Sequence, residues 1–194
     1  MASILSAYSR ALNAHPLITK CLTSVVLGCS GDIAAQRIMS KDEHFKVDWG
    51  RVFRMGFVCM CYGGINHYWY NFLQQSIKLE GMQRVLTKMA FDQLFFVPVF
   101  DSFMFFGLSA LEDPHNQPSA GIRRVKACLW NTLKVNYCVW PFLQIINFKY
   151  VPLQYQVFFT TVGVFFWNIF LSDMANRRGK QAAAAAAAAA AHVE

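Results

Sequence analysis

The feature that most constrains the fold of this chain is a long stretch without a charged side chain, residues 150–172. A helix of about 20 residues crosses the ~30 Å hydrocarbon core of a lipid bilayer. Lys149 precedes the stretch and Arg177 and Arg178 follow it, while Trp167 lies near its end, where aromatic side chains contact the membrane interface. The stretch therefore predicts a membrane-spanning helix in an integral membrane protein.

The composition supports this interpretation. Hydrophobic residues make up 55% of the 194-residue chain and charged residues only 15%, whereas about a quarter of an ordinary soluble domain is charged. The net charge is +7, but the basic residues form short clusters beside apolar runs rather than one long block. Such clusters are typical of contacts to lipid headgroups. We therefore expect membrane lipids as partners, including anionic lipids such as cardiolipin, and no nucleic acid.

Four apolar segments are long enough to cross a bilayer. Two of them carry acids within their length, Asp32 in one and Asp92 and Asp101 in another, and acids at membrane depth turn towards neighbouring helices. We predict an all-α protein, an integral membrane four-helix bundle. A single membrane domain, residues 1–175, would contain the spans at about 17–39, 49–73, 85–111 and 151–172.

Two other segments predict helices that do not cross. Apolar residues recur at helical spacing near the N-terminus, which predicts a short interfacial helix, although this acid-free segment also resembles a mitochondrial targeting sequence. Residues 119–139 predict an amphipathic interfacial helix before the last span, broken or kinked at Pro141. The tail, residues 176–194, includes the all-alanine run Ala182–Ala191, which has the composition of placeholder or tag residues and does not enter the fold prediction.

Small residues at helical spacing indicate where the spans pack. Because small side chains let two backbones approach closely, they mark helix contacts in membranes, where no hydrophobic force drives helices together. These positions are Gly28 and Gly31 in the first span and Gly56, Gly63 and Gly64 in the second.

The charged residues within the spans predict specific pairs. Asp32 lies at about the same depth below one surface as Arg51 and Arg54 at the start of the next span, so we expect an ion pair between Asp32 and one of them.

The acids of the third span differ from each other. The same depth matching pairs Asp92 with His67 or Asn168. Asp101 lies near mid-membrane without an obvious basic partner, so we expect it to face a water-filled path or a partner subunit. The two acids are nine residues apart, on opposite faces of an ideal helix, which excludes a carboxylate dyad.

No pattern of catalytic or cofactor-binding residues is present in the sequence. The six cysteines contain no Cys-x-x-Cys pair, and no histidine spacing completes a zinc site. The sequence also lacks a glycine-rich phosphate loop and a nucleophile elbow. We therefore expect no enzyme activity, no metal and no cofactor.

Several ordered motifs of uncommon residues follow one another along the chain: Gly31-Asp32-x-x-x-Gln36, Asp48-Trp49-x-Arg51-x-x-Arg54, His67-x-Trp69-Tyr70, Lys88-x-x-x-Asp92-Gln93, Asn136-Tyr137-x-x-Trp140-Pro141-x-x-Gln144-x-x-Asn147 and Trp167-Asn168. Over about residues 5–175 the chain resembles the Mpv-17 / 22-kilodalton peroxisomal membrane protein family. The resemblance implies a small four-span protein of the mitochondrial inner membrane or, alternatively, the peroxisomal membrane. Some members are regarded as weakly selective pores for small metabolites, and none is an established enzyme.

Two functions are compatible with these patterns. The first is a pore or transport-like role for small solutes, which contributes to mitochondrial or peroxisomal homeostasis and could require a homo-oligomer. The alternative is a non-catalytic accessory subunit of a larger inner-membrane complex such as a respiratory complex. The predicted pore- or bundle-lining polar residues are Asp32, Arg51, Arg54, His67, Asp92, Gln93, Asp101, Gln144, Asn147 and Asn168.

Overall fold

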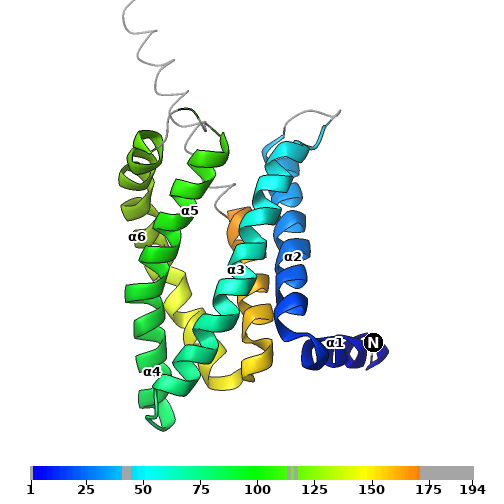
Figure 1. Ribbon diagram of the computed structural model, residues 1–194, viewed down its shortest axis with the longest axis vertical. Helices are drawn as coiled ribbons and strands as arrows, with labels where there is room; N and C mark the ends of the chain where they lie inside the picture. The colour runs from blue at the N-terminus through cyan, green and yellow to red at the C-terminus, as the bar shows by residue number, and fades with distance from the viewer. Residues whose placement is uncertain (1, 41–44, 113–114, 116–117, 171–194) are drawn as a thin grey trace, which may run out of the picture.

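A computed structural model describes residues 2–40, 45–112, 115 and 118–170, and in this part of the chain all regular structure is helical (Figure 1). The predicted tail, residues 176–194, and the end of the last predicted span lie outside the described residues. The elements are α1 (Ala2–Ala14), α2 (Pro16–Met39), α3 (Trp49–Ser76), α4 (Gly81–Phe91), the π-helix η1 (Asp92–Phe96), α5 (Val97–Glu112), α6 (Ser119–Tyr150) and the 3₁₀ turn η3 (Leu153–Tyr155). Residues 156–170 form a further helix.

The short helix α1 lies crosswise to α2 at one end of the molecule (Figure 1). Pro16 starts α2 at its first turn, where a missing N–H costs nothing and the fixed φ angle suits a helix. On α1, Ser9 Oγ lies 2.6 Å from the Tyr155 hydroxyl, and the Tyr8 ring contacts the Phe158 ring at 5.6 Å between centroids. These contacts fix α1 against the turn that precedes helix 156–170.

Helices α2 and α3 pack against each other through most of the predicted small residues. A Cβ added at Gly28 would collide with Cys59, and one at Gly56 would lie 3.0 Å from Cys29 Sγ. A Cβ at Gly63 would lie 3.0 Å from the Lys20 backbone oxygen of α2. The two helices therefore approach closely, and a methyl group at any of these positions would require neighbouring atoms to shift.

The other two predicted packing glycines have different surroundings. Gly31 lies against Phe165 of helix 156–170 rather than against α3, and a Cβ there would be 3.3 Å from the Phe165 backbone. At Gly64 the nearest atom to an added Cβ would be Cys21 Sγ at 3.5 Å, an ordinary van der Waals distance. Gly64 therefore lies near α2 without requiring the absence of a side chain.

The segment predicted as the third span is helical from α4 through η1 to α5, and it contains one turn of π-helix. In that turn the Val97 N–H donates to the carbonyl of Asp92, five residues back. Pro98 follows directly, and in a regular helix its ring would clash with the carbonyl four residues earlier. The wider turn accommodates the proline without ending the helix.

The end predicted for the amphipathic helix at residue 139 is wrong. α6 continues through Pro141 to Tyr150 and packs along α4 and α5. Its 32 residues correspond to about 48 Å of helix, more than the thickness of a bilayer core. The predicted interfacial helix is thus the first part of a longer helix. The final helix begins at residue 156 rather than 151, because Pro152 and η3 precede it.

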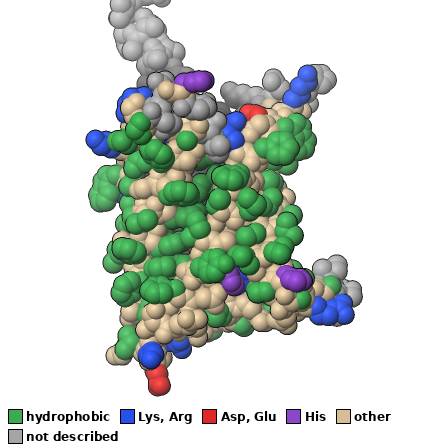
Figure 2. Space-filling model, viewed as in Figure 1, with side chains coloured by type: hydrophobic (Ala, Val, Ile, Leu, Met, Phe, Trp, Pro, Cys, Tyr) green, Lys and Arg blue, Asp and Glu red, His purple; other side chains and the backbone are tan. Residues whose placement is uncertain are grey.

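The distribution of polarity is the reverse of that in a soluble protein. Large apolar side chains cover the outside of the helices, including Phe53, which is 76% exposed, and Leu94, which is 71% exposed. Asp32, Asp92 and Asn147 are almost completely buried. Figure 2 shows hydrophobic side chains along the helices and Lys and Arg mainly towards the two ends. By length and composition, two helical stretches within the described residues could cross a membrane, Pro16–Met39 and Gly81–Ala110. This arrangement is expected of a chain surrounded by lipid.

We predict that Gly63→Ala destabilises the protein by about 1–3 kcal/mol, because the new methyl group would force α2 and α3 apart. The matched control is Gly64→Ala on the same helix, where the methyl group meets only ordinary contacts. Thermal unfolding of both variants in the same detergent measures the difference. Equal melting temperatures for the two variants would contradict the close approach at Gly63.

Candidate functional site

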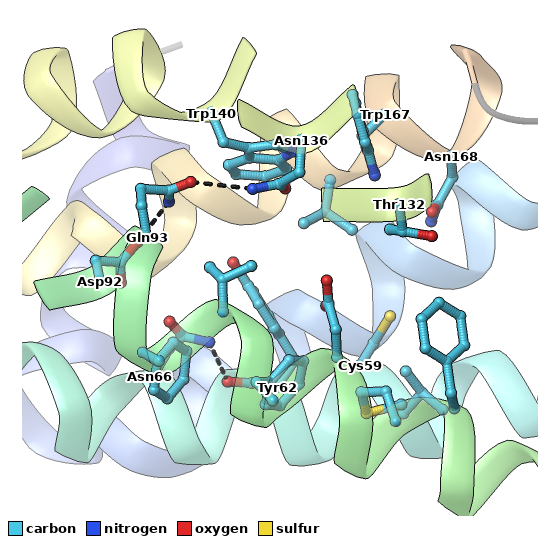
Figure 3. Close-up of a pocket in the computed structure, with 18 of the residues that line it drawn as sticks. Cys59, Tyr62, Asn66, Asp92, Gln93, Thr132, Asn136, Trp140, Trp167 and Asn168 are labelled. Carbon is cyan, nitrogen blue, oxygen red and sulfur yellow. Dashed lines mark hydrogen bonds between the residues drawn. The ribbon is translucent and has the colours of Figure 1, made fainter. Parts of the chain in front are cut away.

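A cavity of about 210 Å³ lies between α3, η1, α5, α6 and helix 156–170 (Figure 3). Its wall is mainly apolar, with polar side chains contributed by all five of these elements. Among the predicted site residues, those that line it are Asp92, Gln93, Asp101, Gln144 and Asn168. The structure therefore brings together half of the predicted residues around one space.

The carboxylate of Asp92 is fully satisfied by hydrogen bonds at the wall of this cavity. Trp69 Nε1 donates to Oδ1 at 2.9 Å, and the side-chain amides of Gln93 and Gln144 both donate to Oδ2 at 2.8 Å. The predicted partners of Asp92, His67 and Asn168, are wrong. Depth matching compared polar groups at the same depth in the membrane and missed the donors Trp69 and Gln144. Both residues belong to the sequence motifs described above.

These hydrogen bonds extend into a network that joins α3, η1 and α6. The Gln144 amide also donates to the Tyr70 hydroxyl at 3.1 Å and accepts from Asn147 Nδ2 at 2.9 Å. Asn136 Nδ2 donates to Gln93 Oε1 at 3.0 Å, as Figure 3 shows. Asn147 thus belongs to the network without lining the cavity. Trp69, Tyr70 and Asn136 were missing from the predicted site residues, although the motifs contain all three.

Asp101 also lines the cavity, and its surroundings differ from those of Asp92. No described residue donates a hydrogen bond to its carboxylate, and the side chain is partly exposed. The prediction that Asp92 and Asp101 face opposite ways is wrong. The π-helical turn at η1 adds about one residue, which rotates the following helix face by roughly 100°.

Two donors at the cavity wall have no acceptor among the described residues. They are the indole N–H of Trp140, on α6, and the amide Nδ2 of Asn168, on helix 156–170. A buried donor without an acceptor costs about 1–3 kcal/mol. Both nitrogen atoms have almost no accessible surface, so they are buried within the wall, whereas Asp101 is the acid without a described donor that lines the cavity.

The other predicted ion pair lies outside the cavity. Arg51 Nε donates to Asp32 Oδ1 at 2.8 Å, and Gln36 Nε2 donates to Asp32 Oδ2 at 2.8 Å. Gln36 Oε1 in turn accepts from the backbone N–H of Asp48, whose carboxylate caps the start of α3. The predicted pair is thus present with Arg51, while Arg54 forms no ion pair with a described residue. This group links the end of α2 to the start of α3.

His67 is also remote from the cavity wall. Its Nδ1 atom lies 3.1 Å from Nζ of Lys20, a lysine that is only 4% exposed. The contact joins α3 to α2. Of the predicted polar residues, those that do not line the cavity are therefore Asp32, Arg51, Arg54, His67 and Asn147.

A helical protein with an apolar exterior and a buried polar network belongs to the class of integral membrane proteins. Comparison with known proteins gives the family. The chain is 33% identical over 178 residues to "Protein SYM1" of Gibberella zeae, which covers 89% of this chain and 97% of the relative. It is 35% identical over 182 residues to "PXMP2/4 family protein 2" of Dictyostelium discoideum, covering 90% and 92%.

A third relative is "Peroxisomal membrane protein 2" of Bos taurus, 29% identical over 175 residues and covering 88% of each chain. The model of the Mpv17 / PMP22 family matches residues 115–172. No solved structure matches the chain. The chain belongs to the Mpv17 / PMP22 family.

We predict that Asp32→Asn lowers the free energy of unfolding by about 1–2 kcal/mol, because an amide cannot accept from Arg51 and Gln36 as a carboxylate does. The partial exposure of Arg51 limits the effect. Thermal unfolding in detergent measures it, with Arg54→Gln as the matched control, expected within about 0.5 kcal/mol of the parent protein. A larger loss in Arg54→Gln than in Asp32→Asn would show that the wrong arginine has been paired.

We predict that Gln144→Leu destabilises the protein by about 2–3 kcal/mol, since it removes a donor from Asp92 and an acceptor from Asn147 in a buried network. Gln75→Leu, at an exposed position on α3, serves as the control. Chemical denaturation in detergent, followed by tryptophan fluorescence, reports both. Equal stability of the two variants would show that the network contributes little to folding.

Proposed function

We propose that this protein is a mitochondrial or peroxisomal membrane protein that forms a weakly selective pore or transport-like path for small solutes. In this proposal the four predicted spans form a membrane bundle, α6 completes it, and the cavity is the polar section of the path. The observation that carries the proposal is the position of Asp101, an acid without a described hydrogen-bond donor on a cavity inside helices with apolar exteriors.

An acid in this position is best explained by access to water or solute. An uncompensated charge in hydrocarbon is costly, and such residues commonly mark substrate or ion pathways. The surrounding residues include no catalytic set. No group of three His, Cys, Asp or Glu among the described residues could hold a metal. A path for solutes therefore accounts for this site better than a catalytic reaction does.

The network around Asp92 gives this path a closed end. Gln93, Asn136 and Gln144 are all at least nine-tenths buried and are bonded to one another or to Asp92. The cavity of about 210 Å³ would be one section of the path. In our proposal conduction requires either rearrangement of this network or assembly of several copies.

We predict that the purified protein conducts ions in planar bilayers and that Asp101→Asn reduces the preference for cations over anions, since it removes the free negative charge from the path. Reversal potentials in a salt gradient measure the preference. Glu80→Gln is the matched control, because Glu80 is an exposed acid before α4 and does not line the cavity.

Absence of conductance at high protein loading would contradict the pore. Conductance with the same charge preference in both variants would contradict the cavity as its path. Migration of the native protein with a megadalton complex in mild detergent would instead favour the accessory-subunit hypothesis, which stays a prediction.

A further inference from the structure

Two cations of α4 lie together at the end of the molecule where α3 connects to α4 (Figure 1). Arg84 Nη2 donates to the backbone oxygen of Gln74 at 3.1 Å, and Lys88 Nζ donates to the side-chain oxygen of the same residue. Arg84 and Lys88 are one helical turn apart, an arrangement in which two like charges repel each other. Both cations therefore bond to a neutral residue while their positive charges lie close together.

No acid compensates these two charges directly. Neither cation forms an ion pair with a described acid. Glu80, before α4, is exposed, and Asp92, one turn after Lys88, takes its hydrogen bonds from other side chains. Lys88 is only 4% exposed, and a buried ammonium group without a paired counter-charge is costly. An anion beside the two cations would lower this cost.

Arg84 is the member of the pair that an anion can reach. Its Nε atom is buried without an acceptor and its Nη2 atom is bonded to Gln74, whereas Nη1 is neither buried nor bonded to a described residue. Lys88 lies behind it, and its charge acts over a distance because screening is weak in a medium of low dielectric constant. An anion bound to Nη1 of Arg84 would therefore be attracted by Lys88 without touching it.

An apolar groove follows on the same helix. It has a volume of about 240 Å³, spans the end of α4 and the start of η1, and is lined by Ala90, Phe91, Leu94 and Phe95. Phe91 is 52% exposed and comes seven residues after Arg84, so it lies on the same face about 10 Å further along the helix. When Arg84 is at the headgroups of a bilayer, the groove is therefore at the depth of the acyl chains.

We propose that Arg84, Lys88 and this groove form a binding site for an anionic phospholipid. The phosphate group accepts from Nη1 of Arg84 and is attracted by Lys88, and one acyl chain lies along Phe91 and Phe95. Arginine is well suited to binding phosphate oxygens, and basic residues beside membrane helices attract anionic headgroups. The site lies outside the cavity, and it does not depend on the proposed pore.

The test is native mass spectrometry of the full chain, released from detergent micelles after one lipid has been added. Dioleoylphosphatidylglycerol is anionic, whereas dioleoylphosphatidylcholine has the same acyl chains and a phosphate group but no net charge. We expect the anionic lipid to bind roughly fivefold more tightly. Arg84→Gln should weaken its binding by roughly the same factor. The matched control, Arg123→Gln at an exposed position of α6, should leave the binding unchanged.

A second variant tests the buried charge. Lys88→Met removes the charge and keeps an unbranched side chain, so it should weaken the anionic lipid by roughly threefold and leave the neutral lipid unchanged. The melting temperature in detergent without added lipid shows whether each variant folds. If Lys88→Met does not fold, Arg84→Gln still decides the proposal, because its side chain is partly exposed.

Two results would overturn the site: equal binding of the two lipids by the parent protein, or equal losses in Arg84→Gln and Arg123→Gln. Glycerol 3-phosphate supplies the same phosphate chemistry without acyl chains, and we expect it not to displace the anionic lipid at equal concentration. Displacement by glycerol 3-phosphate at that concentration would overturn the lipid as the occupant and assign the two cations to a soluble phosphate compound.

Discussion

The buried carboxylate of Asp92 is the group on which the rest of this structure depends. It cannot be left unsatisfied in a medium without water, and its three donors come from α3, η1 and α6. These three hydrogen bonds fix the positions of α3, η1 and α6 relative to one another. In lipid, where apolar surfaces gain little by associating, such hydrogen bonds fix the positions of helices that a soluble protein would fix by burying hydrocarbon.

The helices of the bundle therefore pack through two kinds of interface. α2 and α3 meet through glycines and cysteines, with the Asp32–Arg51 pair at one end, whereas α3 meets η1 and α6 through the polar network. α5 packs mainly along α6 and makes little contact with α3. The cavity lies beside the polar network, and Asp92, Gln93 and Gln144 form part of its wall.

The sequence was informative where length and polarity alone decide the structure. Long apolar segments identified α2, α3 and the α4–α5 segment as helices, although two of these segments carry charges, and depth matching found the partner of Asp32. Depth matching failed for Asp92, because it proposed His67 or Asn168 and overlooked the donors Trp69, Gln93 and Gln144. The π-helical turn was also beyond sequence reasoning: one additional residue changes every later side-chain direction but leaves the composition of the helix unchanged. Pro141 was expected to break or kink α6, and the helix continues through it, so the break is absent.

The unmatched groups on the cavity wall distinguish it from a packing defect. An accidental void in a membrane bundle would be lined by apolar side chains, because an unsatisfied polar group adds its own cost to that of the void. Here the carboxylate of Asp101 on α5, which has no donor among the described residues, shares one space with amide side chains of η1, α6 and helix 156–170. Because these polar groups come from different helices, the tertiary fold assembles the polar part of the wall, and no single local conformation could do so.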